Sequence, residues 1–195
     1  MIASDHLHRA ARLHGPRPLA ICSDEVRTYA EIELRTNRLA NALLASGLQV
    51  GDRVGTWLEN SIRCLELDFA LAKAGLVRVS LNPKLSARES EFILADAQAK
   101  AFFHDASFDA GVTELQPNVP NLKTVVRIDG GRRQYEDFLA GGGEQAPGVR
   151  FDPEHLYCLF YTSGTTGRPK GVMLSHRAIL QVSYNLCMEI GPWET

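Results

Sequence analysis

One short run, residues 161–171, combines the side chains that a phosphate-binding loop needs. It reads Tyr-Thr-Ser-Gly-Thr-Thr-Gly-Arg-Pro-Lys-Gly, with three glycines, four serine or threonine hydroxyls and one lysine in eleven positions. Glycine lets the backbone approach a ligand closely, and successive backbone N–H groups in such a turn can form an anion-binding nest. The hydroxyls add donors and Lys170 adds positive charge. This composition predicts a loop that holds a polyphosphate.

Two apolar segments flank the run and would hold it in place. Residues 156–161 predict a buried strand, because they form a short, mainly apolar run. Residues 172–174 are also apolar, and Ser175 follows as a candidate N-cap of a helix that extends to about Ile190. We therefore expect the loop to lie between two buried elements. His176 would have a structural role in the first helical turn, and Arg168 would be a solvated loop residue.

Strand and helix signals alternate along the chain at the spacing of βαβ units. Two capping boxes, at residues 28–31 and 86–89, mark the starts of two helices. The predicted fold class is α/β, with a mostly parallel sheet flanked by helices on both faces. Ligands of such sheets bind beyond the carboxyl ends of the strands, where the phosphate-binding run would emerge. The predicted strands cover residues 18–22, 26–29, 52–58, 76–81, 101–103, 122–128 and 156–161.

The run is not a Walker A motif, because G-x-x-x-x-G-K-[ST] places its lysine directly after a glycine. Residues 161–172 instead resemble the phosphate-binding signature of the adenylate-forming (AMP-binding) superfamily, which contains acyl-CoA synthetases, peptide-synthetase adenylation domains and luciferases. Residues 28–32 and 71–83 are similar to two earlier segments of that family, in the same order. Asn82 and Pro83 look more like an acyl-CoA synthetase, since peptide-synthetase adenylation domains tend to have Asp-Pro there.

This resemblance implies a two-step reaction in the parent enzyme. A carboxylic acid reacts with ATP to give an acyl-adenylate and pyrophosphate, and the acyl group then passes to the thiol of coenzyme A. By resemblance, Lys170 is the catalytic cation that pairs with a phosphate, and Thr162 is a hydroxyl ligand of Mg²⁺. The implied cofactors and co-substrates are ATP, Mg²⁺ and coenzyme A. The residues implied at the nucleotide site are Thr162, Ser163, Gly164, Thr165, Thr166, Gly167 and Lys170.

The later motifs of that family do not occur in this sequence. We therefore expect residues 1–195 to be the N-terminal portion of the AMP-binding domain, without the C-terminal domain. We also expect this chain alone to form no acyl-adenylate. Most of the acid pocket is implied to lie outside these residues, so the sequence names no particular acid. Apolar surface that further chain would cover should be exposed, which leaves a homo-oligomer open.

Composition limits the partners and the compartment. The 195 residues carry a net charge of −2, which gives no reason to expect nucleic acid or an anionic membrane as a partner. The four cysteines lie far apart and predict free thiols in a reducing compartment. No apolar run is long enough to cross a bilayer. We therefore expect a cytoplasmic protein that acts on small molecules.

Three interpretations of function stay open at this point. The first is an N-terminal fragment of an acyl-CoA synthetase, and the second is an adenylation domain that loads a carrier protein. The third is a non-catalytic module that binds nucleotide or self-associates. His6, His8 and His14 are interpreted as surface residues, because no partner stands at metal-ligand spacing. Trp57 and Trp193 are interpreted as packing residues.

Overall fold

The computed structural model describes residues 1–128, 133–162 and 168–190. Its centre is a sheet whose strands, within these ranges, lie in the order β6-β5-β3-β4-β7-β8. Every neighbouring pair from β6 to β7 is parallel, and β8 is antiparallel to β7. The predicted class, α/β with a mostly parallel sheet, is confirmed. The strands are β3 (Arg53–Trp57), β4 (Val77–Leu81), β5 (Ala101–Asp105), β6 (Thr124–Ile128), β7 (Leu156–Thr162) and β8 (Lys170–Ser175).

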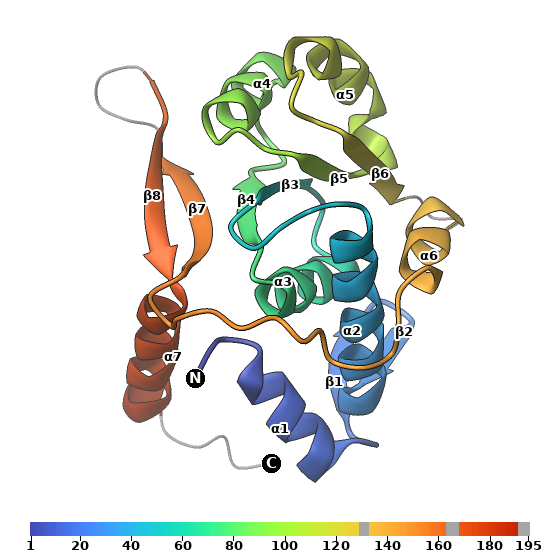
Figure 1. Ribbon diagram of the computed structural model, residues 1–195, viewed down its shortest axis with the longest axis vertical. Helices are drawn as coiled ribbons and strands as arrows, with labels where there is room; N and C mark the ends of the chain where they lie inside the picture. Colours follow the sequence, from blue (N-terminus) through green and yellow to red (C-terminus); the bar gives the residue numbers. More distant parts are fainter. Residues whose placement is uncertain (129–132, 163–167, 191–195) are drawn as a thin grey trace.

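Helices cover both faces of this sheet (Figure 1). One face carries α2 (Tyr29–Ala45), α3 (Ile62–Ala74) and α6 (Arg133–Ala140), and the other carries α4 (Ala87–Asp96) and α5 (Asp109–Leu115). Phe103 packs in the first core with Leu67, whereas its neighbour Phe102 packs in the second with Leu94. Successive side chains of a strand point to opposite faces. Consecutive apolar residues in the strands therefore supply two separate cores.

The helix starts are those that the capping boxes predict. Thr28 accepts a hydrogen bond from the backbone N–H of Glu31, whose carboxylate accepts in return from the N–H of Thr28, and α2 begins at the next residue. Ser86 and Glu89 make the same reciprocal pair at the start of α4. Gly75 ends α3 with φ of 66°, a left-handed conformation that glycine adopts without steric cost. Local sequence therefore fixes the helices that flank the central strands.

The first 28 residues form a smaller unit beside α2. It contains α1 (Asp5–His14) and the antiparallel hairpin of β1 (Pro18–Cys22) and β2 (Glu25–Thr28). Leu7 of α1 packs with Ile32 and Ile62, which ties this unit to α2 and α3. The three histidines of α1 are exposed, as predicted. Two short 3-10 helices, η1 (Ala106–Phe108) and η2 (Gln116–Asn118), complete the segment around α5.

One prediction about the surroundings of the loop needs correction. Residues 170–175 form β8, which returns beside β7 as a hairpin. Contrary to expectation, the two flanking elements are not buried throughout: Phe160 is 39% exposed and Met173 is 70% exposed. Both strands lie at the side of the sheet where the helices of either face end, so their outer parts have little cover (Figure 1).

The last described element is α7 (His176–Ile190), which starts directly after β8. Ser175 caps it as predicted, since its hydroxyl accepts from the backbone N–H of Ala178 at 3.2 Å. Trp57 is 3% exposed and stacks on Phe108, as expected of a packing residue, whereas Trp193 lies outside the described residues. Within the described ranges, no helix combines the length and the apolar character that spanning a lipid bilayer requires.

Candidate functional site

The predicted phosphate-binding run is held between β7 and β8. Thr162 is the last residue of β7, Lys170 is the first of β8, and the two are paired across the strands. Directly paired residues of an antiparallel ladder place their side chains on the same face, about 5 Å apart at Cβ. The hydroxyl of Thr162 and the ammonium of Lys170 therefore start from neighbouring positions at the carboxyl end of β7. This end is also where the parallel strands β3 and β4 finish.

Only part of the predicted nucleotide site can be placed. Thr162, Arg168 and Lys170 are described, and all three are exposed. Lys170 forms no ion pair within the described part of the chain, so its charge is available to a ligand. The remaining predicted members lie outside the described residues; they are Ser163, Gly164, Thr165, Thr166 and Gly167.

On the opposite face of the hairpin, a hydrogen bond from Tyr161 to Asp96 ties β7 to α4, and the sequence did not predict this contact. Tyr161 is paired with Gly171, and a Cβ placed on Gly171 would lie 3.1 Å from the tyrosine ring. The Tyr161 hydroxyl donates to Asp96 at the end of α4 at 2.6 Å. Burial, together with the Asp96 carboxylate, raises the pKa of Tyr161 above its usual value. The phenol therefore stays protonated and ties the end of β7 to α4. Its ring occupies the space beside Gly171 that a larger side chain would fill.

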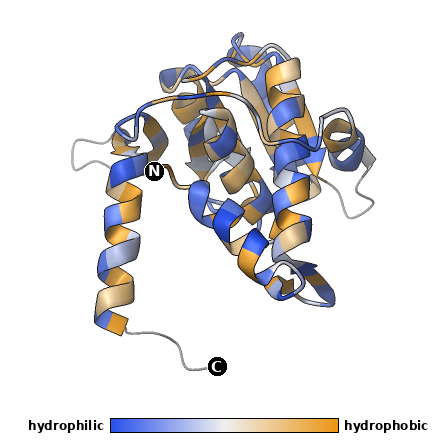
Figure 2. Cartoon of the chain, turned by 60° about the horizontal axis from the view of Figure 1, so that its bottom comes forward, coloured by the Kyte–Doolittle hydropathy of each residue, from blue (hydrophilic) through white to orange (hydrophobic). Residues whose placement is uncertain are grey.

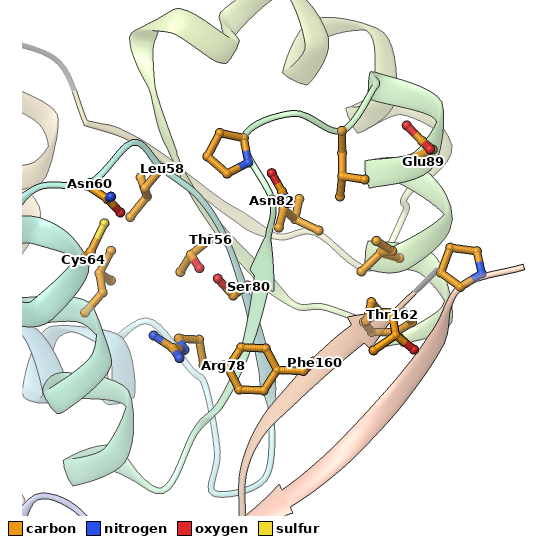
Figure 3. A pocket seen from close by; sticks show the side chains of 17 residues that line it. Thr56, Leu58, Asn60, Cys64, Arg78, Ser80, Asn82, Glu89, Phe160 and Thr162 are labelled. Atoms are coloured by element: carbon orange, nitrogen blue, oxygen red, sulfur yellow. The ribbon is translucent and has the colours of Figure 1, made fainter. Parts of the chain in front are cut away.

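A pocket opens beside the hairpin where β3, β4 and β7 end (Figure 3). Its cavity volume of about 840 Å³ falls within the range of small-molecule sites, roughly 300–1,000 Å³. Thr162 and Pro169 line its edge at the loop, and Asn60 and Asn82 line it at the ends of β3 and β4. Two described residues of the predicted phosphate-binding run, Thr162 and Pro169, thus lie at the edge of a cavity that is large enough for an organic ligand.

The side chains along the strands within this pocket were not predicted as functional. Thr56 of β3 and Ser80 of β4 are paired in register, and Arg78 precedes Ser80 by two residues on the same face. A signal for them exists in residues 77–81, where Val77, Val79 and Leu81 are buried and alternate with an arginine and a serine. A strand with one polar face inside a sheet covered by helices indicates that this face meets something other than an apolar core.

Arg78 is held by an ion pair and two aromatic rings. Its guanidinium lies 3.0 Å from Asp68 of α3, and its Cζ stands 5.7 Å from the ring centre of Phe160 and 5.9 Å from that of Tyr157. The Tyr157 hydroxyl also donates to Asp68, at 2.6 Å. Burial and the Asp68 carboxylate raise the pKa of Tyr157. One carboxylate therefore anchors β4 and β7 to α3 behind the pocket.

His176 is fully buried at the base of the hairpin, in the first turn of α7, which agrees with the predicted structural role. Its Nδ1 accepts a hydrogen bond from the backbone N–H of Ala3 at 3.2 Å, and its ring lies against Phe151 and Tyr157. Burial, with a smaller effect of His155, lowers the pKa of His176 to about 4. The ring is therefore neutral near pH 7 and acts as an acceptor that ties the N-terminal segment to α7.

Comparison with known proteins identifies the family. A family model described as AMP-binding enzyme matches residues 7–194, which is nearly the whole chain. The chain belongs to the AMP-binding enzyme family. A "Long-chain-fatty-acid--CoA ligase" of Thermus thermophilus is 39% identical over 185 residues, covering 90% of this chain and 34% of that protein. A "Medium-chain-fatty-acid--CoA ligase" of Ectopseudomonas oleovorans is 32% identical over 202 residues, covering 96% of this chain and 37% of that protein.

The fold agrees with this family assignment. The inhibitor-bound N-terminal domain of FACL13 from Mycobacterium tuberculosis superimposes with a TM-score of 0.83 at 27% identity, covering 90% of this chain and 44% of that one. This AMP-binding chain spans about a third of the length of the two ligases it matches. What those ligases do as whole proteins is therefore carried to this chain only as a proposal.

Proposed function

We propose that this chain carries the ATP-phosphate-binding part of an AMP-forming acyl-CoA ligase. Such a protein activates a carboxylic acid as an acyl-adenylate and transfers the acyl group to coenzyme A. The observation that carries the proposal is the pairing of Thr162 with Lys170 at the carboxyl end of β7, in a chain of the AMP-binding family. The two ligases named above support fatty acids as the class of acid.

The chemistry of the first step suits the residues at this position. Attack of a carboxylate on the α-phosphorus releases pyrophosphate, so negative charge builds up on the β- and γ-phosphate oxygens. A cation and hydrogen-bond donors already in place stabilise that charge without reorganisation. We assign the cation to Lys170, which has no competing ion pair in the described part of the chain. The donors we assign to Ser163, Thr165 and Thr166, with Gly164 and Gly167 shaping the loop.

Mg²⁺ fits the same arrangement as a phosphate-bound ion. It usually keeps several waters and binds one or two protein oxygens besides the phosphates, and Thr162 offers one hydroxyl at the pocket edge. Within the described residues, no group of three or more histidine, cysteine or acidic side chains could hold a metal ion. When bound, the ion would neutralise phosphate charge. In this proposal Thr162 orients it, and Lys170 acts from the neighbouring strand.

The proposal also includes the domain to which these residues belong, the partners and the cellular location. Residues 1–195 are taken as the N-terminal portion of the AMP-binding domain, since the family model extends over residues 7–194. The partners are small molecules, namely the acid, ATP and coenzyme A. A cytoplasmic location is supported by four cysteines that are all unpaired.

The test is carboxylate-dependent exchange of pyrophosphate into ATP, measured with the full-length gene product and a panel of short, medium and long fatty acids. We expect exchange that needs both the acid and Mg²⁺, followed by thioester formation with coenzyme A. The 195-residue chain alone should support no exchange. Thioester formation on a carrier protein in place of coenzyme A would favour an adenylation domain. ATP binding without exchange for any acid would favour a non-catalytic nucleotide-binding module and overturn the proposal.

A further inference from the structure

The end of the β7–β8 hairpin extends beyond the sheet (Figure 1). The last residue of β7 that pairs with β4 is Phe160. Strands β7 and β8 stay paired for two further residues each, Tyr161 with Gly171 and Thr162 with Lys170, and we call these four residues the hairpin end. Within the described ranges β8 is the outermost strand, so no other strand holds the hairpin end. A two-stranded pair is at best marginally stable by itself in water, so the hairpin end needs another support.

Tyr161 supplies that support. Its ring packs against the second core, which α4 helps to form, and its hydroxyl donates to the Asp96 carboxylate of α4 at 2.6 Å. Within the described part of the chain, the side chains of Thr162 and Lys170 form no hydrogen bond or ion pair, and Gly171 has no side chain. Among the described residues, the contact of Tyr161 with α4 is therefore what fixes the position of the hairpin end.

Helix α4 is itself held at both ends. A capping box closes its first turn, and at its other end the Nε of Arg53 on β3 donates to the carbonyl of Ala97 at 2.7 Å. Glu89 and Ile93 of this helix line the pocket. Asp96 follows Ile93 by three residues, so it lies on the same face. One fixed helix therefore faces both the pocket and the hairpin end.

Two residues at this contact are unfavourable for the elements that contain them. Asp96 is the last residue of α4, where the helix dipole disfavours a negative charge. Gly171 lies within β8, where a glycine weakens the strand, and a Cβ in its place would lie 3.1 Å from the Tyr161 ring. Such local conflicts are expected at functional sites. Neither residue is explained by its own element, whereas both are explained by the contact of Tyr161 with α4.

We propose that Tyr161 and Asp96 are positioning residues of the nucleotide site. Their hydrogen bond fixes the hairpin end against α4, so that the Thr162 hydroxyl and the Lys170 ammonium meet the phosphates of ATP at a set distance from the pocket. The pair acts through Thr162 and Lys170 and not on the ligand. This inference rests on the proposed function, because it takes the hairpin end as part of the phosphate-binding element.

Acyl-adenylate formation by the full-length gene product tests the proposal. Tyr161→Phe removes the hydroxyl and keeps the ring, and it should lower kcat/KM for ATP roughly tenfold, because catalytic groups lose effect when they are displaced. Asp96→Ala should cause the same loss, and the double variant no more than either change alone, since all three lack the same bond. Asp96→Asn keeps an oxygen that accepts from the phenol, so it should retain most of the activity. A parent-like value in Tyr161→Phe, or losses that add in the double variant, would overturn the proposal.

Two comparisons separate positioning from a purely structural role. Tyr157→Phe breaks a bond of the same kind, from a phenol to the Asp68 carboxylate at 2.6 Å, next to the part of β7 that is paired with β4. It should lower the melting temperature and leave kcat/KM for ATP unchanged. Asp96→Ala also removes an unfavourable charge from the helix end, so it should melt closer to the parent than Tyr161→Phe does while losing as much activity. Activity that follows the melting temperature across these variants would mean that the pair serves only the fold.

A measurement without catalysis keeps this inference apart from the proposed function. In the isotope-labelled 195-residue chain without nucleotide, NMR relaxation should show larger motion of the Thr162 and Lys170 amides in Tyr161→Phe and no change in Tyr157→Phe. A parent that forms no acyl-adenylate would reject the proposed function, whereas larger motion would still show that the bond holds the hairpin end. An active parent, together with unchanged activity and motion in Tyr161→Phe, would reject this inference and leave the proposed function standing.

Discussion

Lys170 is the first residue of β8, so its backbone is fixed while its long side chain can still reach a ligand. Its backbone is fixed by pairing with Thr162, while its side chain is exposed and forms no ion pair within the described residues. Pro169, directly before it, restricts the backbone further. The ammonium is therefore positioned by the hairpin without being neutralised by it, as a residue that stabilises developing phosphate charge requires.

Lys170→Ala should slow acyl-adenylate formation in the full-length gene product by roughly 10²-fold or more, the usual effect of losing one preorganised electrostatic contact. The melting temperature should stay close to that of the parent, because no buried carboxylate is left unpaired. Pre-steady-state adenylation at saturating ATP measures the effect. Arg168→Ala, which removes an exposed cation two residues away, is the control and should retain the rate. An unchanged rate in Lys170→Ala, or a collapse of its melting temperature, would show that the residue serves the fold.

Gly171 leaves room for the ring of Tyr161, its partner on β7. A Cβ at this position would lie 3.1 Å from the Tyr161 ring, so Gly171→Val should displace the ring and break the bond from Tyr161 to Asp96. We expect a loss of about 1–3 kcal/mol in unfolding free energy, of which about 1 kcal/mol comes from the hydrogen bond. Tyr161→Phe separates the two parts, since it removes the bond and keeps the ring. Denaturant unfolding that shows equal losses for both variants would mean that the ring is not displaced.

The family could be predicted because its signature is contiguous in sequence, and the family model confirms it, whereas the roles of the individual residues stay predictions. The run from Thr162 to Lys170 could be recognised because its glycines, hydroxyls and lysine stand together. Thr56 and Ser80 could not, since they become neighbours only when β3 and β4 pair, and each alone is an ordinary strand residue. The roles of Tyr161 and Asp96 likewise depend on α4 reaching the hairpin. The assignments of Ser163 to Gly167 stay predictions, because these residues lie outside the described ranges.

At the scale of elements, α2 and α3 are joined by a buried lysine. Lys73 donates to Glu33 Oε2 at 2.7 Å, to Thr36 Oγ1 at 2.8 Å and to Asn37 Oδ1 at 2.6 Å, and its side chain is 5% exposed. Burial lowers the pKa of Lys73, and the Glu33 carboxylate opposes that shift. The ammonium is thus held by three side-chain oxygens of α2 and by the backbone carbonyl of Glu33, and these contacts fix the end of α3 before β4 starts.

Lys73→Met should cost about 3–5 kcal/mol in unfolding free energy, the range found when one partner of a buried pair is removed. The loss arises because the oxygens of Glu33, Thr36 and Asn37 remain in place without their donor. Chemical denaturation of the purified chain measures it. Lys100→Met is the matched control: Lys100 is 42% exposed and lies 2.7 Å from Asp52, so its loss should cost about 1 kcal/mol or less. Equal losses would mean that burial does not strengthen the Lys73 interactions.

Helix boundaries could be predicted where neighbouring residues in the sequence determine them. The pairing of β8 could not, because it depends on contacts between segments. Both capping boxes and the end of α3 at Gly75 follow from nearest neighbours, and the structure confirms them. The apolar residues 172–174 indicate an extended segment but not the direction in which it pairs. That direction depends on how the chain turns between Thr162 and Lys170. The exposure of Met173 was missed for the same reason, since only the position of β8 at the edge of the sheet leaves it uncovered.

Across the described part of the molecule, the largest group of exposed apolar side chains lies on β8 and α7, and a smaller group on α1 and the β1–β2 hairpin consists of Leu13, Ile21 and Val26. Helix α7 extends away from the rest of the chain, and hydrophobic positions along it face outward (Figure 2). Exposed apolar surface was expected from the sequence and is found here, whereas self-association stays a prediction. The largest exposed apolar residues on β8 and α7 are Met173 (70%), Val182 (64%), Leu186 (56%), Met188 (85%) and Ile190 (51%).

The contacts of His176 join the start of α7 to β7 and to the N-terminal segment. The ring contacts Phe151 before β7 and Tyr157 within it, and accepts from Ala3 at the start of the chain. Three segments of the chain, namely its start, residues 151–157 and the first turn of α7, therefore meet at one neutral imidazole. Protonation would put a charge in this buried place and turn the acceptor nitrogen into a donor that faces the N–H of Ala3. The whole arrangement is consequently sensitive to acid.

The folded chain should lose stability as the pH falls from about 6.5 to 4. The pKa of His176 is about 4 when folded, below the value of about 6.5 in an unfolded chain. Between these values the unfolded state binds more protons, so the stabilisation is complete above pH 6.5 and is lost as the pH falls toward 4. The expected loss is on the order of 3 kcal/mol. Buried His104, whose pKa is also lowered by burial, acts in the same direction.

His176→Asn isolates the contribution of this one ring, because the asparagine Oδ1 keeps an acceptor for Ala3 but does not titrate. The variant will be less stable at pH 7, since it loses the ring contacts, but its unfolding free energy should change less between pH 7 and pH 4.5. The difference between the two pH profiles, measured by denaturant unfolding, removes the effect of His104, which both proteins share. A variant profile as steep as that of the parent would place the acid sensitivity elsewhere. A flatter profile would mean that neutrality of His176 holds the N-terminal segment, β7 and α7 together.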